Sequence, residues 1–282
     1  MNSFMSWVGG KKALRNEVLA RFPPYYGRYI EVFGGGGWVL FNKPPGMDFE
    51  VYNDFNSNLA NLYCCVRDKP SKLKYKLLYC LNSREDFNWI VSLHKRGIFQ
   101  RLNDADRAAK FYQLIRYSYA SSLDSFGSQP HSIWSDFPQI DMASRRLQKV
   151  IVENKDFEKL IRQYDRPVSF FYCDPPYFAT ENYYKDVGFT TKDHIRLRDT
   201  LVSCKGKYLV SYNDCPEIRE IWNQPGIYIE EISRMNNLAQ RYEGGSEYAE
   251  LFISNYDTSE RKKEVEQMSF FDEIYDNGGL IL

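Results

Sequence analysis

The sequence predicts a doubly wound, Rossmann-like α/β sheet that is interrupted by a mainly helical insertion. Two strand-like runs, Tyr29 to Phe33 and Phe49 to Tyr52, are each followed by a turn and a helix signal. This alternation is typical of a parallel sheet. A third apolar run, Val168 to Cys173, resumes the pattern much later in the chain. The residues between the second and third runs are helical in pattern, which predicts the insertion.

The first strand-like run leads into the glycine turn Gly34-Gly35-Gly36-Gly37 and then into the helix-like segment Trp38-Val39-Leu40-Phe41. Glycines let a backbone approach a bound ligand closely and adopt positive φ. A dinucleotide site would need a third glycine where Val39 stands, and Gly9-Gly10-Lys11 lacks the other residues of a Walker loop. A turn that holds S-adenosylmethionine tolerates the observed pattern.

The second strand-like run ends at Asn53-Asp54-Phe55-Asn56. In doubly wound folds a carboxylate at the end of the second strand holds the ribose hydroxyls of a nucleoside ligand. Asp54 is the candidate for this role. The alternative is that Asp54 caps the helix predicted from Ser57 to Val66, and the two roles are physically compatible.

The third strand-like run ends at the tetrapeptide Asp174-Pro175-Pro176-Tyr177. Its prolines fix two φ angles and have carbonyl groups that act only as acceptors. The Asp174 carboxylate and the Pro175 carbonyl can accept both protons of an exocyclic amino group, while the Tyr177 ring offers a face on which a base can stack. Such acceptors favour a transition state in which positive charge grows on nitrogen. The stretch predicts methyl transfer to an aromatic amine, and its alternative is an ordinary turn.

The segment between the second and third strands is predicted to be helical and basic. Asn103-Asp104 offers an N-cap, and apolar residues from Ala108 to Ile115 recur at three- and four-residue spacing. Between Arg67 and Arg116, twelve Lys and Arg residues stand against five Asp and Glu residues, a net charge of +7. With aromatic residues interleaved, this predicts a surface that contacts phosphates; the alternative is a set of solvated helix faces.

The elements after the tetrapeptide continue the sheet. Phe178 to Phe189 is predicted as a flap over the site, and Thr190-x-x-Asp193 resembles a capping box that begins a helix. His194 stands in the first turn of this helix, where a structural role is favoured over a catalytic one. Leu209 to Asn213 is predicted as a parallel strand that ends at the same edge as Asp174, with Ser211 and Asn213 behind the site.

Four motifs, in this order, resemble the Dam-type DNA adenine methyltransferases. They are Trp7-Val8-Gly9-Gly10-Lys11, Glu31-Val32-Phe33-Gly34-Gly35-Gly36, Asn53-Asp54-Phe55-Asn56 and Tyr172-Cys173-Asp174-Pro175-Pro176-Tyr177. The resemblance runs from about Phe4 to Tyr256. It implies a doubly wound methyltransferase sheet at residues 1–66 and 150–258, with a helical target-recognition domain inserted at residues 67–149. It also implies transfer of a methyl group from S-adenosylmethionine to the amino group of a flipped-out adenine in double-stranded DNA.

The resemblance implies the following site residues. The residues that would bind the cofactor are Trp7, Lys11, Glu31, Phe33, Gly34, Gly36, Asp54 and Asp174. The residues that would bind the target base are Asp174, Pro175 and Tyr177. Base readout requires side chains that enter a groove and fill the gap left by a flipped nucleotide. The candidates, in and beside the aperiodic stretch from Tyr117 to Pro138, are Arg116, Tyr119, Gln129 and His131.

Two departures from the family and two alternatives remain. Val32 stands where the family often has proline, and the segment from Tyr117 to Ser122 differs from that of the members that recognise GATC. The sequence therefore leaves open which DNA sequence is recognised and whether the enzyme is paired with a restriction nuclease. The first alternative is methylation of RNA or of the cytosine amino group. Asp174 favours adenine, because serine is usual at this position in the cytosine enzymes. The second alternative is a catalytically silent DNA-binding regulator.

Composition is consistent with an enzyme in the cytoplasm. The 282 residues are 43% hydrophobic and 16% aromatic, which is ample for a buried core. No apolar run is long enough to span a bilayer, and the first residues lack a secretory core, so we expect no membrane partner. The six cysteines form no Cys-x-x-Cys pair and predict packing, with no metal site and no disulfide framework.

The last residues, 259–282, are predicted as a charged linker and tail. Within them, Gln267-Met268-Ser269-Phe270-Phe271 resembles the peptides with which bacterial DNA enzymes bind the replication sliding clamp. The alternative is a tail that docks on its own domain or stays disordered.

Overall fold

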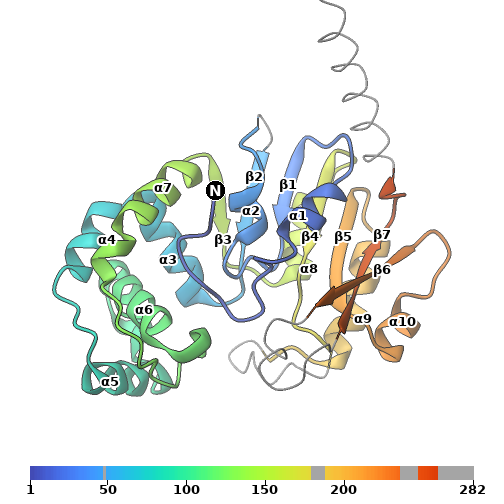
Figure 1. Ribbon diagram of the computed structural model, residues 1–282. Helices are drawn as coiled ribbons and strands as arrows, with labels where there is room; N and C mark the ends of the chain where they lie inside the picture. The colour runs from blue at the N-terminus through green and yellow to red at the C-terminus, as the bar shows by residue number, and fades with distance from the viewer. Residues whose placement is uncertain (47–48, 179–187, 236–246, 260–282) are drawn as a thin grey trace, which may run out of the picture.

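A seven-stranded mixed sheet forms the centre of the molecule in a computed structural model that describes residues 1–46, 49–178, 188–235 and 247–259 (Figure 1). The strand order is β3-β2-β1-β4-β5-β7-β6. Strands β3, β2, β1, β4 and β5 are parallel, and β7 runs antiparallel to both β5 and β6. The bounds are Arg28–Glu31 for β1, Phe49–Asn53 for β2, Val150–Glu153 for β3, Ser169–Cys173 for β4, Lys207–Asn213 for β5, Tyr228–Met235 for β6 and Glu247–Ser254 for β7.

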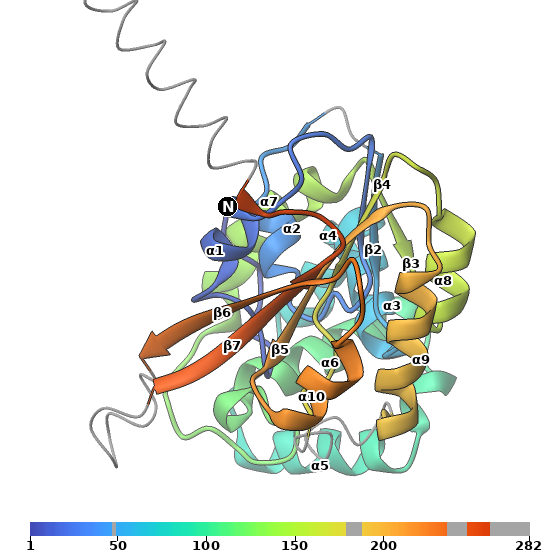
Figure 2. The same cartoon turned by 90° about the vertical axis from the view of Figure 1, so that its right-hand side faces the viewer.

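Helices cover both faces of this sheet, with α1 and α2 on one side and α8 and α9 on the other (Figure 2). The helices that pack on the sheet are α1 (Arg15–Ala20), α2 (Trp38–Asn42), α3 (Ser57–Asp68), α8 (Phe157–Tyr164), α9 (Thr191–Val202) and α10 (Pro216–Trp222). Four more helices lie between β2 and β3 in the sequence, beyond α3: α4 (Pro70–Leu77), α5 (Arg84–Lys95), α6 (Asp104–Tyr117) and α7 (Phe137–Leu147).

Side chains alternate between the two faces of each strand, and each face has its own hydrophobic cluster. On β4, Phe170 and Tyr172 belong to the cluster on the α3 side, whereas Phe171 and Cys173 belong to the cluster beneath α8, α9 and α10. A strand that is buried on both faces needs apolar residues throughout. This requirement explains the continuous apolar run that predicted β4.

The cluster on the α3 side continues without a break into the helices between β2 and β3. Tyr52 of β2, Leu59 of α3, Leu114 of α6 and Ile140 of α7 are fully buried members of the same cluster. The helical segment therefore shares a hydrophobic core with one face of the sheet.

Local sequence signals predicted several elements correctly. Asn103 caps α6 by accepting a hydrogen bond from the backbone N–H of Asp106. Thr190 and Asp193 form the predicted capping box at the start of α9. The aperiodic stretch from Tyr117 to Pro138 contains a short antiparallel bridge between Ser118 and Phe126.

Two other predictions fall wholly or mostly outside the described residues. The predicted flap falls largely on residues 179–187 and the clamp-like peptide on residues 267–271.

The six cysteines are free thiols, and Cys65 and Cys173 are buried. A segment that crosses a bilayer would need a longer and more apolar helix than any in the described part of the chain.

Candidate active site

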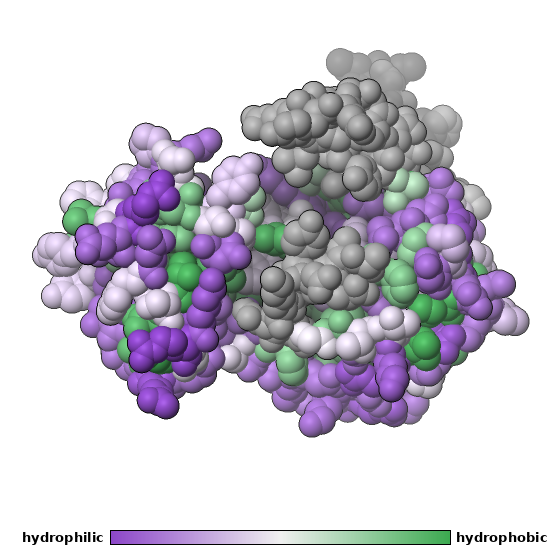
Figure 3. All heavy atoms as spheres, turned by 90° about the horizontal axis from the view of Figure 1, so that it is seen from below, coloured by the Kyte–Doolittle hydropathy of each residue, from purple (hydrophilic) through white to green (hydrophobic). Residues whose placement is uncertain are grey.

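The candidate site lies where β1 and β4 end side by side. Glu31, the last residue of β1, pairs in register with Tyr172 of β4. The chain leaves β1 toward β2 on one side and leaves β4 toward β5 on the other, so the crevice at these strand ends is a topological switch point, the usual ligand site of open α/β sheets. Figure 3 views the molecule from this side, where the surface is hollowed next to the mainly hydrophilic helical part.

A cavity of about 690 Å³ occupies this crevice. All the residues that the resemblance assigned to the cofactor line it: Trp7, Lys11, Glu31, Phe33, Gly34, Gly36, Asp54 and Asp174. The other residues assigned to the target base lie differently. Pro175 is buried, Pro176 lines the cavity in its place, and Tyr177 lies beside the cavity without lining it.

The glycine turn is pressed between aromatic rings. A Cβ atom on Gly34 would lie 2.2 Å from the Tyr52 ring, and one on Gly35 would lie 2.9 Å from Trp7. Gly35 also has a φ of +49°, which disfavours any side chain. The Tyr52 hydroxyl donates a hydrogen bond of 2.7 Å to the Gly35 carbonyl and fixes the turn against β2. Glycine is thus required here by packing within the protein.

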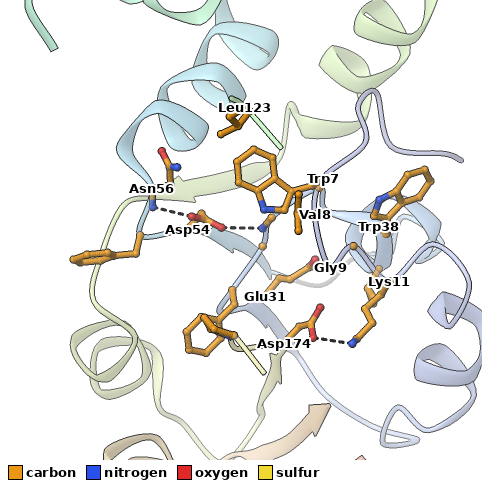
Figure 4. Close-up of a pocket in the computed structure, with 18 of the residues that line it drawn as sticks. Trp7, Val8, Gly9, Lys11, Glu31, Trp38, Asp54, Asn56, Leu123 and Asp174 are labelled. Carbon is orange, nitrogen blue, oxygen red and sulfur yellow. Dashed lines mark hydrogen bonds and ion pairs between the residues drawn. The ribbon is translucent and has the colours of Figure 1, made fainter. Parts of the chain in front are cut away.

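Asp54 ties the glycine turn to the start of α3. Its carboxylate accepts hydrogen bonds from the backbone N–H of Gly35 at 2.9 Å and of Asn56 at 2.8 Å (Figure 4). Burial raises the pKa of Asp54 to about 6, although both hydrogen bonds oppose the rise. The alternative that Asp54 caps α3 is wrong, because Asn56 is the N-cap and accepts from the N–H groups of Asn58 and Leu59.

Glu31 lies between Asp54 and Asp174 in the view of Figure 4. It is only 2% exposed, and its Oε2 accepts a hydrogen bond of 2.6 Å from the Tyr29 hydroxyl. Burial raises the pKa of Glu31 to about 8 despite this hydrogen bond. The side chain therefore holds a proton at neutral pH in the free protein.

Asp174 is held through one of its two oxygens. The Lys11 ammonium lies 3.0 Å from Oδ1 (Figure 4). The Ser211 hydroxyl donates to the same oxygen at 3.0 Å. Oδ2 makes no hydrogen bond to another residue in the described ranges. Burial raises the pKa of Asp174, and Lys11 opposes the rise. The carboxylate is thus anchored on one side and keeps acceptor capacity on the other.

Tyr177 is held by contacts with Glu250 and Lys11. Its hydroxyl donates a hydrogen bond of 2.9 Å to Oε2 of Glu250, and Lys11 Nζ lies 4.3 Å from the centre of its ring. Asn213, at the end of β5, binds both the N–H and the carbonyl of Phe178, at 3.1 and 3.3 Å. Ser211 and Asn213 thus support the Asp174-to-Phe178 turn from behind, as the sequence suggested.

The sequence reasoning missed one wall of the cavity. This wall comes from the helical segment and consists of His94, Lys95, Ser122, Leu123 and Asp124. Leu123 lies next to the Trp7 indole in Figure 4 and has a φ of 65°, a left-handed conformation that is rare for such a side chain. No sequence pattern signals this conformation.

The candidate DNA-binding residues divide into two pairs. Arg116 donates to both oxygens of Asp136 at 2.8 and 2.9 Å, and His131 Nε2 lies 2.9 Å from the same carboxylate. These two side chains are engaged within the fold. Tyr119, by contrast, is 69% exposed, and Gln129 is also exposed.

The basic character of the helical segment is partly neutralised by ion pairs. Lys74 lies 2.6 Å from Asp141 and Lys76 lies 2.8 Å from Asp106, while Lys69 pairs with Asp104. Asp104 and Asp106 are already counted in the net charge of +7, whereas Asp141 lies outside the counted segment and lowers the positive charge of this surface further. Lys95, which lines the cavity, takes part in no ion pair within the described ranges.

Comparison with known proteins finds one matching family and relatives whose names agree with it. The family model of the D12 class N6 adenine-specific DNA methyltransferases matches residues 7–238. The chain is 27% identical to the type II methyltransferase M1.LlaDCHI of Lactococcus lactis subsp. cremoris, over 91% of this chain and 96% of that protein. It is also 26% identical to a DNA adenine methylase of Haemophilus influenzae, over 88% of this chain and 91% of that protein.

Proposed function

Since this chain belongs to the D12 class of N6 adenine-specific DNA methyltransferases, we propose that its cavity binds S-adenosylmethionine and that Asp174 and Pro175 hold the amino group of the target adenine. One observation supports this assignment above the others. Asp54, Glu31 and Asp174, from three separate strand ends, line the same cavity at the switch point of the sheet.

The residues present fit S-adenosylmethionine. The Asp54 carboxylate follows β2 and lines the cavity, which supports its role as the acceptor for the ribose hydroxyls. Trp7 and Phe33 provide aromatic faces, which attract a cationic sulfur by about 0.5 to 2 kcal/mol each. When bound, S-adenosylmethionine supplies a methyl group on a positively charged sulfur.

Groups of the protein itself accept the two hydrogen bonds of the adenine amino group. Lys11 and Ser211 hold Oδ1 of Asp174, which leaves Oδ2 to accept one N–H of the adenine amino group. The Pro175 carbonyl accepts the other N–H. Two acceptors localise the nitrogen lone pair, and both hydrogen bonds strengthen as the nitrogen gains positive charge, so they lower the barrier to transfer.

We infer further that residues 67–149 form the target-recognition domain. Part of this segment, including Lys95 and Leu123, lines the cavity that we assign to S-adenosylmethionine, which supports a role for the helical part near the site. Tyr119 is exposed in the same loop and is our candidate for filling the gap left by a flipped base in duplex DNA.

Product analysis tests the proposal directly. The purified protein is incubated with labelled S-adenosylmethionine and duplex DNA, single-stranded DNA or RNA, and the modified nucleosides are identified by mass spectrometry. We expect N6-methyladenine in duplex DNA. Label in N4-methylcytosine or only in RNA, or no transfer from S-adenosylmethionine, would contradict the proposal.

A further inference from the structure

Glu250 is a buried carboxylate that reaches the site from β7, the strand beyond β5 in the sheet. It lies in β7 and pairs in register with Asn213 at the end of β5. Because β7 is antiparallel to β5, an early residue of β7 reaches the edge at which β4 and β5 end. Glu250 is 4% exposed and is not among the residues that line the cavity.

Glu250 and Asp174 share the same ammonium group. Lys11 Nζ lies 3.0 Å from Oδ1 of Asp174 and 3.4 Å from Oε2 of Glu250. The side chains of Lys11 and Glu250 are 6% and 5% exposed, so their charges are weakly screened. The Tyr177 hydroxyl donates to the same Oε2 at 2.9 Å and also contacts Lys11.

This arrangement solves a conflict in the demands on Asp174. A carboxylate that is fully engaged with an ammonium is a weaker acceptor for a neutral amine, because the cation withdraws electron density and fixes its orientation. Removing Lys11 instead would leave two buried carboxylates close together, which is costly. A second carboxylate that shares Lys11 gives the ammonium another partner, so that Asp174 keeps acceptor capacity for the amine.

We propose that Glu250 is a positioning residue that shares Lys11 with Asp174, so that the ammonium engages only one oxygen of Asp174 and the other oxygen stays available to the amine of the target adenine. This inference rests on the proposed function, because it assumes that Asp174 receives that amine. Through its hydrogen bond with Tyr177, Glu250 also fixes the ring beside which the base is placed.

The substitution Glu250→Gln isolates the charge. Glutamine has nearly the same shape and keeps an oxygen that can accept from Tyr177, but it cannot share the Lys11 cation. We expect kcat to fall about 10- to 100-fold, the range typical of a misplaced catalytic group. The KM for S-adenosylmethionine and the melting temperature should change little.

The pH profile provides a readout that a purely structural role would not move. The titratable groups that face Asp174 are Lys11 from the N-terminal segment, Glu31 of β1, Tyr172 of β4 and Glu250 of β7. The charge of Glu250 raises the pKa of Asp174. Neutralising it should lower that pKa, so the acid limb of the kcat profile should move to lower pH in Glu250→Gln even though kcat itself is reduced.

Two further variants complete the test. Glu250→Asp keeps the charge and should leave the acid limb where it is in the unmodified protein, while Glu231→Gln, on an exposed side chain, should behave as the unmodified protein. An unchanged kcat in Glu250→Gln, or an equal loss in Glu250→Gln and Glu250→Asp with an unmoved acid limb, would overturn the inference. If Glu250→Gln does not fold, an acid limb that moves in Glu250→Asp would also overturn it. If the unmodified protein transfers no methyl group, it is the proposed function that fails.

Discussion

Asp54, Glu31 and Asp174 are three of the carboxylates that line the cavity, and their surroundings differ. Asp54 has two backbone N–H partners and a pKa of about 6, whereas Glu31 is held by one tyrosine hydroxyl and has a pKa of about 8. Asp174 has a cationic partner in Lys11, 3.0 Å away. Burial raises the pKa of all three, and different partners oppose that rise at each carboxylate.

Substituting Glu31 by glutamine should change how stability depends on pH. Burial raises the pKa of Glu31 from 4.5 to about 8, so as pH rises the unfolded chain releases this proton before the folded protein does, and stability falls across that window. Glu31→Gln removes the effect. Between pH 6 and pH 8, the unmodified protein should lose about 2 kcal/mol of unfolding free energy relative to the variant.

Urea unfolding without cofactor at both pH values measures this difference, with Glu231→Gln as the control for a change of net charge at an exposed position. Asp54 contributes little in this window, because its pKa of about 6 places most of its own effect at lower pH. Parallel pH dependence in Glu31→Gln and the unmodified protein would show that Glu31 ionises normally.

At the scale of elements, the glycine turn after β1 needs glycine because neighbouring aromatic rings leave no room for a side chain. The Tyr52 ring that would collide with a Cβ on Gly34 is itself stacked on Tyr63, with ring centres 3.8 Å apart. Since Tyr52 cannot move away freely, Gly34→Ala should lower the unfolding free energy by about 1 to 3 kcal/mol, as overpacked cores do.

The matched control is Gly27→Ala, just before β1. A Cβ there would meet Val168 at 3.6 Å, an ordinary contact, so its effect should stay below about 1 kcal/mol. Chemical denaturation of the two variants side by side tests this account. Equal effects would show that the turn tolerates a side chain.

The end of α6 and the loop after it contain both side chains that are engaged within the fold and side chains that are exposed. Arg116→Ala leaves the carboxylate of Asp136, which is 3% exposed, without its guanidinium and should cost about 2 kcal/mol of stability. Tyr119→Ala should leave stability within about 0.5 kcal/mol, because the side chain is exposed.

The same two variants should also differ in their KM for DNA. If the Tyr119 ring fills the gap left by the flipped base and stacks on the neighbouring bases, its loss should raise the KM for DNA roughly tenfold. Thermal melting and methylation assays at one fixed salt concentration give both quantities. A stable Arg116→Ala protein with weakened DNA binding would instead assign Arg116 to the DNA interface.

At the scale of the whole molecule, sequence reasoning succeeded where the signal is local. The apolar run of β4, the Asn103 cap of α6 and the Thr190–Asp193 capping box each depend on residues a few positions apart. The order of the four motifs then placed the cavity residues together, because parallel strands end at the same edge.

The remaining features depend on contacts between distant segments. Asp136 binds Arg116 across 20 positions, and Glu250 meets Lys11 across 239. The wall formed by Lys95 and Leu123 requires the helical segment to fold back over the sheet. Pairings of this kind leave no periodic pattern in one sequence, and so the Glu250 contact and the neutralised lysines appear only in the structure.

The most direct measurement compares the unmodified protein with Asp174→Ala in two assays on the same preparations. Excess S-adenosylmethionine, at about 100 times its Kd, should stabilise both proteins by about 2.7 kcal/mol in thermal unfolding. Transfer of labelled methyl groups to duplex DNA should fall at least about 100-fold in Asp174→Ala. Transfer at the unmodified rate would contradict the claim that Asp174 holds the adenine amine, and loss of cofactor binding would show that Asp174 acts on the cofactor instead.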